Sequence, residues 1–308
     1  MNILVVGNFG VGWDGSICDE EHIAAALEEL GHTVYRVQRE QASGIPLTDD
    51  LPDFTLIAQW DGYGDISHLP KPLVYWAFDY QDKGQDWHER LVNMADLYLS
   101  KPFSDSFHKN WRWCSQDFAP SFLDKWEEPI SVEKYEQPPL EKDIDVLFTG
   151  SWVPWESGQD RVKMLKAVEQ NFNLQINSVT PEKWREEGFK NVEGPVMDDA
   201  LPGLIARAKI NFSMDHVYAP GYWSDRNAQI MSCGGFVAFR YVPFSEATFG
   251  SHIANFYDEK TCIDTIEYYL MNDEEREAIA INGYHYAKEN LSVVNRVHQM
   301  LTIVGEIL

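Results

Sequence analysis

Short apolar runs alternate with amphipathic segments along the first third of the chain. Because strands alternate with helical segments here, the pattern predicts a parallel sheet with helices on its faces. The apolar runs have the length of buried strands and the intervening segments have helical spacing. Strands are expected at residues 2–7, 33–37, 54–59, 73–78 and 97–100, and helices at 21–30 and 87–94.

The same alternation restarts after a charged, proline-rich segment at residues 126–143, which we interpret as a linker. Strands are expected at 145–149, 174–179, 209–214, 236–239 and 253–257, and helices at 160–171, 181–187, 200–208, 260–271 and from 273 onward. The sequence therefore predicts two doubly wound α/β domains, 1–125 and 144–290, with a helix at 291–308 as a candidate to pack back on the first. Such folds bind ligands at the carboxyl ends of their strands.

The amino-acid composition limits the kinds of molecule that the protein is expected to bind. With 25 basic and 49 acidic residues, the formal net charge is −24, which disfavours non-specific attraction to nucleic acid or anionic membranes. Acidic surfaces also serve solubility. No apolar run approaches the roughly 20 residues of a membrane span. The four cysteines lack C-x-x-C spacing, so we expect a cytoplasmic protein without a metal site.

An anion site is predicted in the stretch 221–236. Arg226 opens a short helix there that ends at Gly234 and Gly235. A helix N-terminus presents unpaired backbone N–H groups, and the guanidinium of Arg226 adds a fork of donors suited to phosphate oxygens. An ordinary helix with a surface ion pair between Asp225 and Arg226 is the alternative.

A second glycine-rich segment lies near the N-terminus. Gly10, Gly12 and Gly15 satisfy the dinucleotide-binding expression G-x-G-x-x-G, but two residues separate Gly7 at the strand end from this loop. The next helix opens with three acidic residues, 19–21, which would repel a pyrophosphate. We therefore disfavour a nicotinamide or flavin site and expect the loop to let a second substrate approach its backbone.

Several side chains near the predicted carboxyl edge of the first sheet are candidates for the second substrate. Asp14 and Asp79 are candidate catalytic carboxylates, although a turn residue bonded to its own backbone also explains Asp14. Tryptophan presents a flat apolar face that stacks on a sugar or a base. The acceptor-binding candidates are Gly10, Gly12, Trp13 and Trp76.

Further candidates follow strands of the second half. Gly150 and Ser151 end its first strand, and Arg161 is expected near the start of the next helix, where it could hold a diphosphate from the side opposite Arg226. His216, just beyond a strand, is a candidate acid or phosphate contact, although loop histidines are more often structural.

Residues 201–213 and 224–236 resemble the CgeB-like glycosyltransferases, a glycosyltransferase family 1/4-like group with the GT-B fold, whose pattern here is an A-K-I-N strand followed by D-R-x-F-E-x-x-A-C-G-G-F. The resemblance implies two Rossmann-like domains, a nucleotide-sugar donor such as a UDP-sugar on the C-terminal domain, and no metal or cofactor. Arg226 would match the phosphate-contacting arginine of that family. Gln229 stands where glutamate is usual, and an amide both donates and accepts hydrogen bonds.

The resulting hypothesis is a cytoplasmic, metal-independent GT-B glycosyltransferase whose acceptor is a glycan, a protein or a small molecule. Asp14 or Asp79 would orient or deprotonate the acceptor hydroxyl. The alternatives are a phage-type enzyme acting on a hydroxymethylated DNA base, a non-catalytic coat or scaffold protein with this fold, and a nicotinamide-dependent oxidoreductase. The donor-binding candidates are Gly150, Ser151, Arg161, Tyr222, Arg226, Gln229 and Gly234.

Overall fold

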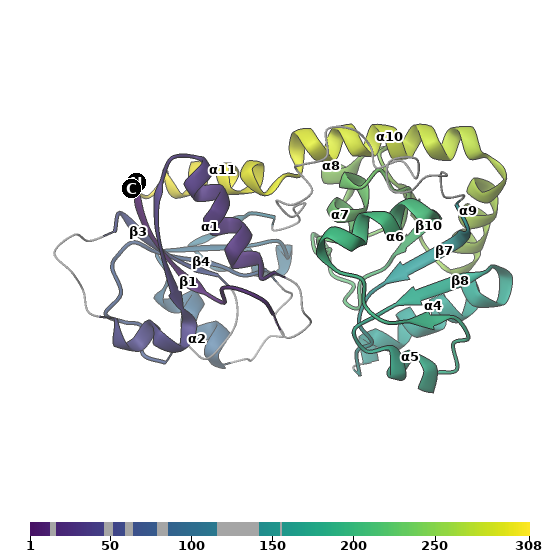
Figure 1. The fold of residues 1–308 in the computed structure, drawn as a ribbon. Helices are drawn as coiled ribbons and strands as arrows, with labels where there is room; N and C mark the ends of the chain where they lie inside the picture. Colours follow the sequence, from purple (N-terminus) through teal and green to yellow (C-terminus); the bar gives the residue numbers. More distant parts are fainter. Residues whose placement is uncertain (13–16, 46–51, 59–63, 79–85, 116–141, 155) are drawn as a thin grey trace. The chain divides into compact units, whose positions relative to one another are not determined.

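The computed structural model describes residues 1–308 apart from 13–16, 46–51, 59–63, 79–85, 116–141 and 155. The chain forms two compact units, one comprising Met1–Ser121 with Ser292–Leu308 and the other Phe122–Leu291. Each unit contains a six-stranded sheet in which every strand pairing is parallel (Figure 1). The predicted pair of doubly wound α/β domains is confirmed. Most of the predicted linker lies outside the described residues.

The sheet of the first unit has the order β2-β1-β3-β4-β5-β6. Its central strands are buried on both faces, which explains their continuous apolar sequences. The three-residue strand at the edge was not predicted, because its two tryptophans flank an arginine and form no apolar run. The strands are β1 (Asn2–Gly7), β2 (Thr33–Gln38), β3 (Phe54–Ala58), β4 (Leu73–Trp76), β5 (Leu97–Ser100) and β6 (Trp111–Trp113).

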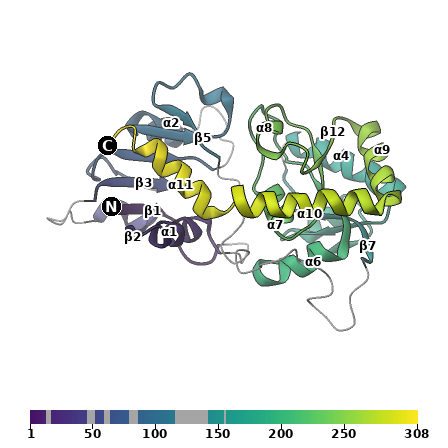
Figure 2. The ribbon, with the colours of Figure 1, turned by 90° about the horizontal axis from the view of Figure 1, so that it is seen from above.

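Helices α1 (Asp19–Glu29) and α11 (Val293–Val304) pack together on one face of this sheet, and α2 (Asp86–Met94) covers the other (Figures 1 and 2). Three acidic residues in the first turn of α1 stabilise its positive end, and Gly31 follows its last turn with φ 84°. Helix α11 begins at Ser292, whose side chain accepts a hydrogen bond from the Asn295 N–H. Its buried face joins the core between α1 and the sheet.

A buried polar network crosses the other face of this sheet. The imidazole of His88 on α2 lies 3.1 Å from the hydroxyl of Tyr75 and 3.5 Å from that of Tyr98. Tyr98 donates to Asp105 at 2.6 Å, and Ser100 donates to the same carboxylate oxygen at 2.7 Å. Burial lowers the pKa of His88, and the nearby charge of His108 acts in the same direction, whereas Asp105 and Glu89 act against it. The folded first unit therefore favours the neutral imidazole.

This network predicts a loss of stability in mild acid. Because the pKa of His88 is lower in the folded state, its stabilising contribution is complete above the unfolded value of about 6.5 and declines as pH falls below it, by at most about 1.4 kcal/mol per pH unit. Chemical unfolding of the wild type and His88→Gln at pH 7.5 and pH 5 measures this effect. The stability difference between the two proteins should shrink at pH 5, and a difference independent of pH would contradict the assignment.

The sheet of the second unit has the order β12-β11-β10-β7-β8-β9. Its apolar core contains side chains of β7, β10 and β11 packed against two helices, α4 (Glu156–Asn171) and α9 (Glu259–Met271). The two-residue strand at its edge was not predicted, since it is too short to form an apolar run. The strands are β7 (Ile144–Thr149), β8 (Leu174–Asn177), β9 (Val192–Glu193), β10 (Ala208–Ser213), β11 (Val237–Arg240) and β12 (Ala254–Phe256).

The helices of this unit follow the predicted order with one consequential difference. Helix α4 begins four residues earlier than expected, so Arg161 lies in its second turn rather than at its start. Gly158 permits this, since a Cβ there would come within 2.5 Å of Val153 Cγ2. The four-residue helix α8 was not predicted. The helices are α4 (Glu156–Asn171), α5 (Pro181–Glu186), α6 (Leu201–Arg207), α7 (Arg226–Ser232), α8 (Glu246–Phe249), α9 (Glu259–Met271) and α10 (Asp273–Asn290).

Candidate diphosphate site on the second unit

The candidate site lies where the chain reverses direction across the second sheet. Strands β7 and β10 are neighbours, but the connections that leave them lead to opposite edges of the sheet. In doubly wound sheets, ligands bind at this switch point, beyond the carboxyl ends of the strands. Gly150 and Ser151 follow β7 here, and Asp215 follows β10. The predicted candidates from these two loops are therefore brought together.

Arg226 spans the two loops. Its Nε donates to the carbonyl oxygen of Thr149 at 2.8 Å, while Nη1 donates to Asp215 Oδ1 and to Ser224 Oγ, each at 3.3 Å. The side chain is 16% exposed and that of Asp215 is 5% exposed, so the pair is not an ordinary surface salt bridge. This geometry fixes the guanidinium while leaving part of it open to solvent.

Arg161 is buried beside Arg226, although most single arginines on helices lie in solvent. It is 2% exposed, and its Nη2 donates to the carbonyl oxygen of Ser151. The buried Nε has no hydrogen-bond partner among the described residues. Burial lowers the pKa of Arg161 to about 9, and the positive charge of Arg226 adds to that effect. The cation is therefore held in an environment that penalises its charge.

The two guanidinium groups share one aromatic neighbour. The Cζ of Arg161 lies 5.4 Å from the ring centroid of Phe148 and that of Arg226 lies 5.5 Å from it. Trp184, fully buried, contributes a second ring at 5.9 Å from Arg161 and donates its indole N–H to Gly150 O at 3.2 Å. Asp215 is the acidic residue that raises the pKa of Arg161. Two cations with one carboxylate between them leave an excess positive charge that suits an anion.

Gly150 has a steric role at this site. A Cβ at this position would lie 2.8 Å from Phe148 Cζ and 3.2 Å from Arg226 Nη2. Any other residue would therefore displace the ring or the guanidinium. The backbone N–H of Gly150 already donates to Asn177 O at 3.1 Å, so its steric contribution, rather than that N–H, serves the site.

The remaining donor candidates take different positions around Arg226. Gln229 donates through Nε2 to Asp225 Oδ2, which fixes both side chains on α7. Tyr222 is buried and close enough to Arg161 to influence its pKa. His216 is partly buried and directly follows Asp215. Of these three residues, His216 and Tyr222 belong to the loop between β10 and α7, and Gln229 lies within α7.

Gly234 lies elsewhere, and its expected contact with the donor needs correction. It follows α7 at the end opposite Arg226 and has φ 73°, a backbone conformation that favours glycine. Gly235 next to it leaves no space for a side chain, since a Cβ would lie 2.6 Å from Ile205 Cγ2. The two glycines therefore end the helix and allow close packing rather than meeting a ligand at the arginine pair.

The N-terminal loop is unsuitable for a phosphate for a more specific reason than the acidic helix start alone. The side chain of Glu20 is 4% exposed and lies over Gly7, where a Cβ would be 2.6 Å from Glu20 Cγ. Its carboxylate accepts a hydrogen bond from the Asn8 N–H at 3.1 Å. A carboxylate therefore occupies the strand end where a dinucleotide site would hold its pyrophosphate.

The candidates for binding and activating the acceptor differ in their exposure, and some lie outside the described residues. Trp76 was wrongly expected at a binding surface, because it is fully buried in the core, with its ring 5.3 Å from that of Phe78. Gly10 is exposed with φ 93°, and Gly12 is partly buried. Trp13, Asp14 and Asp79 lie outside the described residues.

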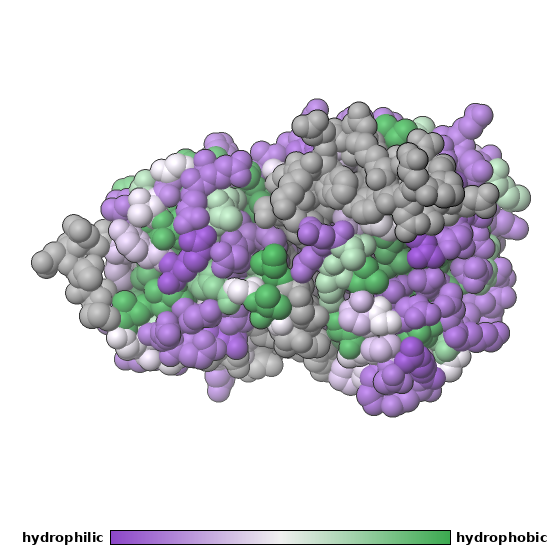
Figure 3. Space-filling model, in the orientation of Figure 1, coloured by the Kyte–Doolittle hydropathy of each residue, from purple (hydrophilic) through white to green (hydrophobic). Residues whose placement is uncertain are grey.

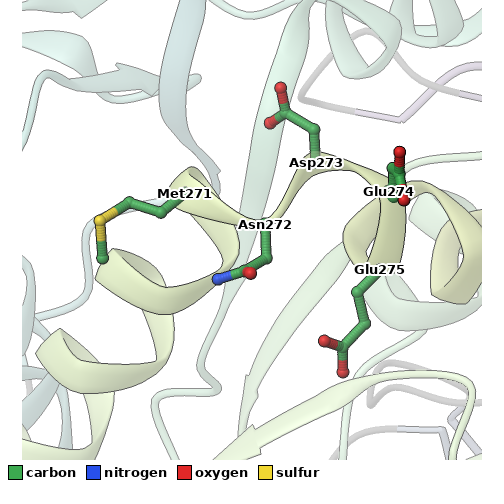
Figure 4. Close-up of a pocket in the computed structure, with 5 residues that line it drawn as sticks. All are labelled: Met271, Asn272, Asp273, Glu274 and Glu275. Atoms are coloured by element: carbon green, nitrogen blue, oxygen red, sulfur yellow. The ribbon is translucent and has the colours of Figure 1, made fainter.

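Two acidic groups elsewhere in the second unit do not resemble a diphosphate site. A pocket between α9 and α10 is lined by Met271, Asn272, Asp273, Glu274 and Glu275. Its side chains point in different directions (Figure 4), and its carboxylates would repel a phosphate. At the amino end of the sheet, Asp143 pairs with Arg207 and Asp145 with Lys209, so the D-x-D sequence forms surface ion pairs.

Three residues of the site were not identified from sequence: Phe148, Trp184 and Asp215. Asp215 carried a usable signal, since it directly follows a buried strand in the loop that leads to Arg226. Phe148 and Trp184 read as ordinary core residues, and only the packing shows that their rings support the arginines. A buried aromatic residue gives no sequence signal for such a role.

Hydrophilic residues cover much of the face seen in Figure 3, as expected for a chain of net charge −24. In the described part of the chain, no helix is both long enough and apolar enough to cross a membrane.

Comparisons with known proteins agree with this architecture. Residues 161–302 match the family described as glycosyl transferase-like. No curated protein matches the sequence. Among solved structures, a sucrose-phosphate synthase from Thermosynechococcus elongatus is 10% identical with a TM-score of 0.67, covering 100% of this chain and 99% of that one.

Two further structures contain UDP-glucose. Anabaena HepE in complex with UDP-glucose is 15% identical with a TM-score of 0.66, and covers 99% of this chain and 100% of that one. A mutant T4 phage BGT in complex with UDP-glucose is 11% identical with a TM-score of 0.65, and covers 98% of this chain and 99% of that one. These similarities confirm the predicted fold. The chain therefore contains a glycosyl transferase-like domain at residues 161–302 and has the GT-B fold.

Proposed function

We propose that this protein transfers a sugar from a nucleotide-sugar donor, preferably a UDP-sugar, to an acceptor hydroxyl. The observation that carries the proposal is the pair of arginines at the switch point of the second sheet, one of them buried with a lowered pKa. A nucleoside diphosphate supplies the negative charge that this pair lacks. The UDP-glucose complexes of HepE and T4 phage BGT, which have the same fold, support this choice of donor.

The arginine pair would act mainly on the leaving group. As the bond between sugar and diphosphate breaks, negative charge develops on the phosphate oxygens, and fixed positive charge stabilises it without reorganisation. Arg226 would contact the phosphates through its exposed edge, and Arg161 would add charge from beneath. His216 would contact the phosphates from the adjoining loop. Because these groups neutralise the charge, the proposed reaction requires neither a metal nor a cofactor.

The acceptor would be held mainly by the first unit. We propose that Asp14 or Asp79 orients or deprotonates its hydroxyl, with Trp13 as a stacking surface and the backbone at Gly10 and Gly12 open to approach. Glu20 keeps the phosphate away from this loop. The finer assignment to the CgeB-like group is likewise a proposal, supported by the residues around Arg226 and Gln229.

A thermal-unfolding screen of nucleotide sugars tests this function. A bound donor stabilises the folded state by RT ln(1 + [L]/Kd), about 2.7 kcal/mol at a hundredfold excess over Kd. We expect UDP-sugars to raise Tm, NAD(H) to leave it unchanged, and the stabilising donor to be slowly hydrolysed with release of UDP. Stabilisation by NAD(H) alone would indicate an oxidoreductase, and donor binding without any turnover would indicate a non-catalytic protein.

A further inference from the structure

Exposed aromatic side chains gather at the carboxyl ends of three neighbouring strands of the second sheet. Tyr218 lies in the loop after β10 and is 53% exposed, and Tyr257 follows β12 and is 63% exposed. Tyr241 follows β11 and is partly exposed. We refer to Tyr218, Tyr241 and Tyr257, together with Arg240, as the tyrosine surface. Large aromatic groups are normally buried, so their exposure together at a ligand-binding edge requires an explanation.

Contacts hold these rings in place. The guanidinium of Arg240 lies 4.9 Å from the ring centroid of Tyr218, and the rings of Tyr241 and Tyr257 are 5.1 Å apart at an angle of 43°. The hydroxyl of Tyr241 donates to Glu246 at 3.2 Å. Arg240 directly precedes Tyr241 in the chain, which links these two contacts. The rings are therefore fixed in one neighbourhood before any ligand arrives.

Phe244, three residues after Tyr241, adds a strained position to the same segment. It is 49% exposed and has φ 76°, a region that non-glycine residues rarely adopt. Such strain persists only where the surrounding structure imposes it, and it concentrates at functional sites. Phe244 therefore combines a half-exposed ring with a backbone conformation that costs free energy.

The chemistry of the tyrosine surface matches a sugar ring. One face of a pyranose is lined by C–H groups that pack on aromatic rings, and its rim carries hydroxyls that both donate and accept hydrogen bonds. Tyrosine offers an apolar face and a polar tip, while Arg240 and Glu246 supply a donor and an acceptor. A polyanion such as a nucleic-acid backbone would find one cation here beside a carboxylate, which is a poor match.

The tyrosine surface also adjoins the proposed diphosphate site. Tyr218 lies in the loop that connects Asp215 to Arg226. That loop is tied to the segment after β11 by a hydrogen bond from the Gly221 N–H to Pro243 O at 3.0 Å. We propose that the tyrosine surface binds a sugar ring, either the hexose of the donor or a saccharide acceptor. This inference rests on the proposed function and names the class of substrate.

The test uses two single variants, Tyr218→Ala and Tyr257→Ala, with Tyr268→Ala as the control. Tyr268 is 45% exposed on α9 and bonded to Glu275, outside the tyrosine surface. Calorimetry measures the affinity for UDP alone and for the UDP-sugar that most stabilises the wild type. An array of immobilised oligosaccharides, probed in the presence of UDP, measures saccharide binding. Both variants should keep wild-type affinity for UDP.

Two results would support the inference and locate the sugar. A loss of about tenfold in affinity for the UDP-sugar, with UDP unchanged, identifies the donor hexose. A similar loss of binding to the oligosaccharide array, with the affinities for UDP and for the UDP-sugar both unchanged, identifies a saccharide acceptor. Variants equal to the wild type in every measurement would overturn the inference while leaving the glycosyltransferase intact. A wild type that binds neither UDP nor a UDP-sugar would instead refute the proposed function.

Phe244→Gly provides an independent readout. Relief of the positive φ should raise Tm, whereas sugar binding in the same assays should fall, because the exposed ring is lost. A variant that loses stability while retaining sugar binding would show that Phe244 serves only the fold and has no part in sugar binding.

Discussion

Arg226→Ala should weaken UDP binding at least a hundredfold. The substitution removes the charged donors that would meet the diphosphate and leaves Asp215, 5% exposed, without its ion-pair partner. Charged hydrogen bonds contribute about 1.5–3 kcal/mol each, and 1.4 kcal/mol corresponds to a tenfold change in affinity. The diphosphate therefore loses the attraction of Arg226 and is repelled by Asp215, and both effects weaken UDP binding. Calorimetric titration with UDP measures the effect directly.

The UDP affinity of Arg226→Lys should lie between that of the wild type and that of Arg226→Ala. A single ammonium keeps the charge but cannot reach Thr149 O and Asp215 with a planar fork, so its position is less well fixed. Arg207→Ala is the matched control, since Arg207 pairs with Asp143 at the other end of the same sheet. Unchanged UDP affinity in a folded Arg226→Ala protein would remove Arg226 from the donor site.

Arg161→Met should weaken UDP binding while the stability of the ligand-free protein stays constant or rises. Methionine retains the apolar stem against Phe148 and Trp184 but removes a buried charge whose pKa is lowered to about 9. The loss of one hydrogen bond to Ser151 O is offset by relief of this burial and of repulsion from Arg226. We expect the ligand-free stability to stay constant or to rise by about 1 kcal/mol, within the range expected of a buried charge.

The same variant should lose most of the stabilisation that UDP provides. The buried cation is unfavourable in the free protein and is neutralised by the diphosphate, so its removal weakens binding by about tenfold or more. Thermal unfolding with and without UDP gives both quantities, and Arg185→Met, at an arginine paired with Glu182 on α5, controls for loss of charge alone. A variant that is several kcal/mol less stable yet binds UDP normally would identify Arg161 as a structural residue.

The architecture was predictable because each buried parallel strand is a continuous apolar run. Strands such as β1 and β5 were placed at their observed limits, since a polar residue or a glycine borders each apolar run. The short edge strands β6 and β9 were missed, because two or three residues form no recognisable pattern. The start of α4 was misplaced for a related reason: Gly158 discourages a helix in isolation, and packing against Val153 overrides that preference.

Candidate residues near strand ends were easier to identify than their neighbours. The place of Arg226 after β10 and before α7 follows from the order of elements, and its type indicates an anion. Trp76 was misjudged because a tryptophan has the same sequence signal in a core as at a binding surface. Gly234 was misjudged because a glycine that ends a helix and a glycine that admits a ligand are not distinguishable by type.

By itself, the sequence determined the α/β class, the two-domain order and the loop that carries Arg226, because periodicity and local residue types record these features. Only the tertiary structure decided that Arg161 and Arg226 share one aromatic neighbour, that Glu20 occupies the end of β1, and that Tyr218 contacts Arg240 while Tyr241 contacts Tyr257. These relations join residues from distant segments. Their energies depend on burial and proximity, which no local pattern encodes.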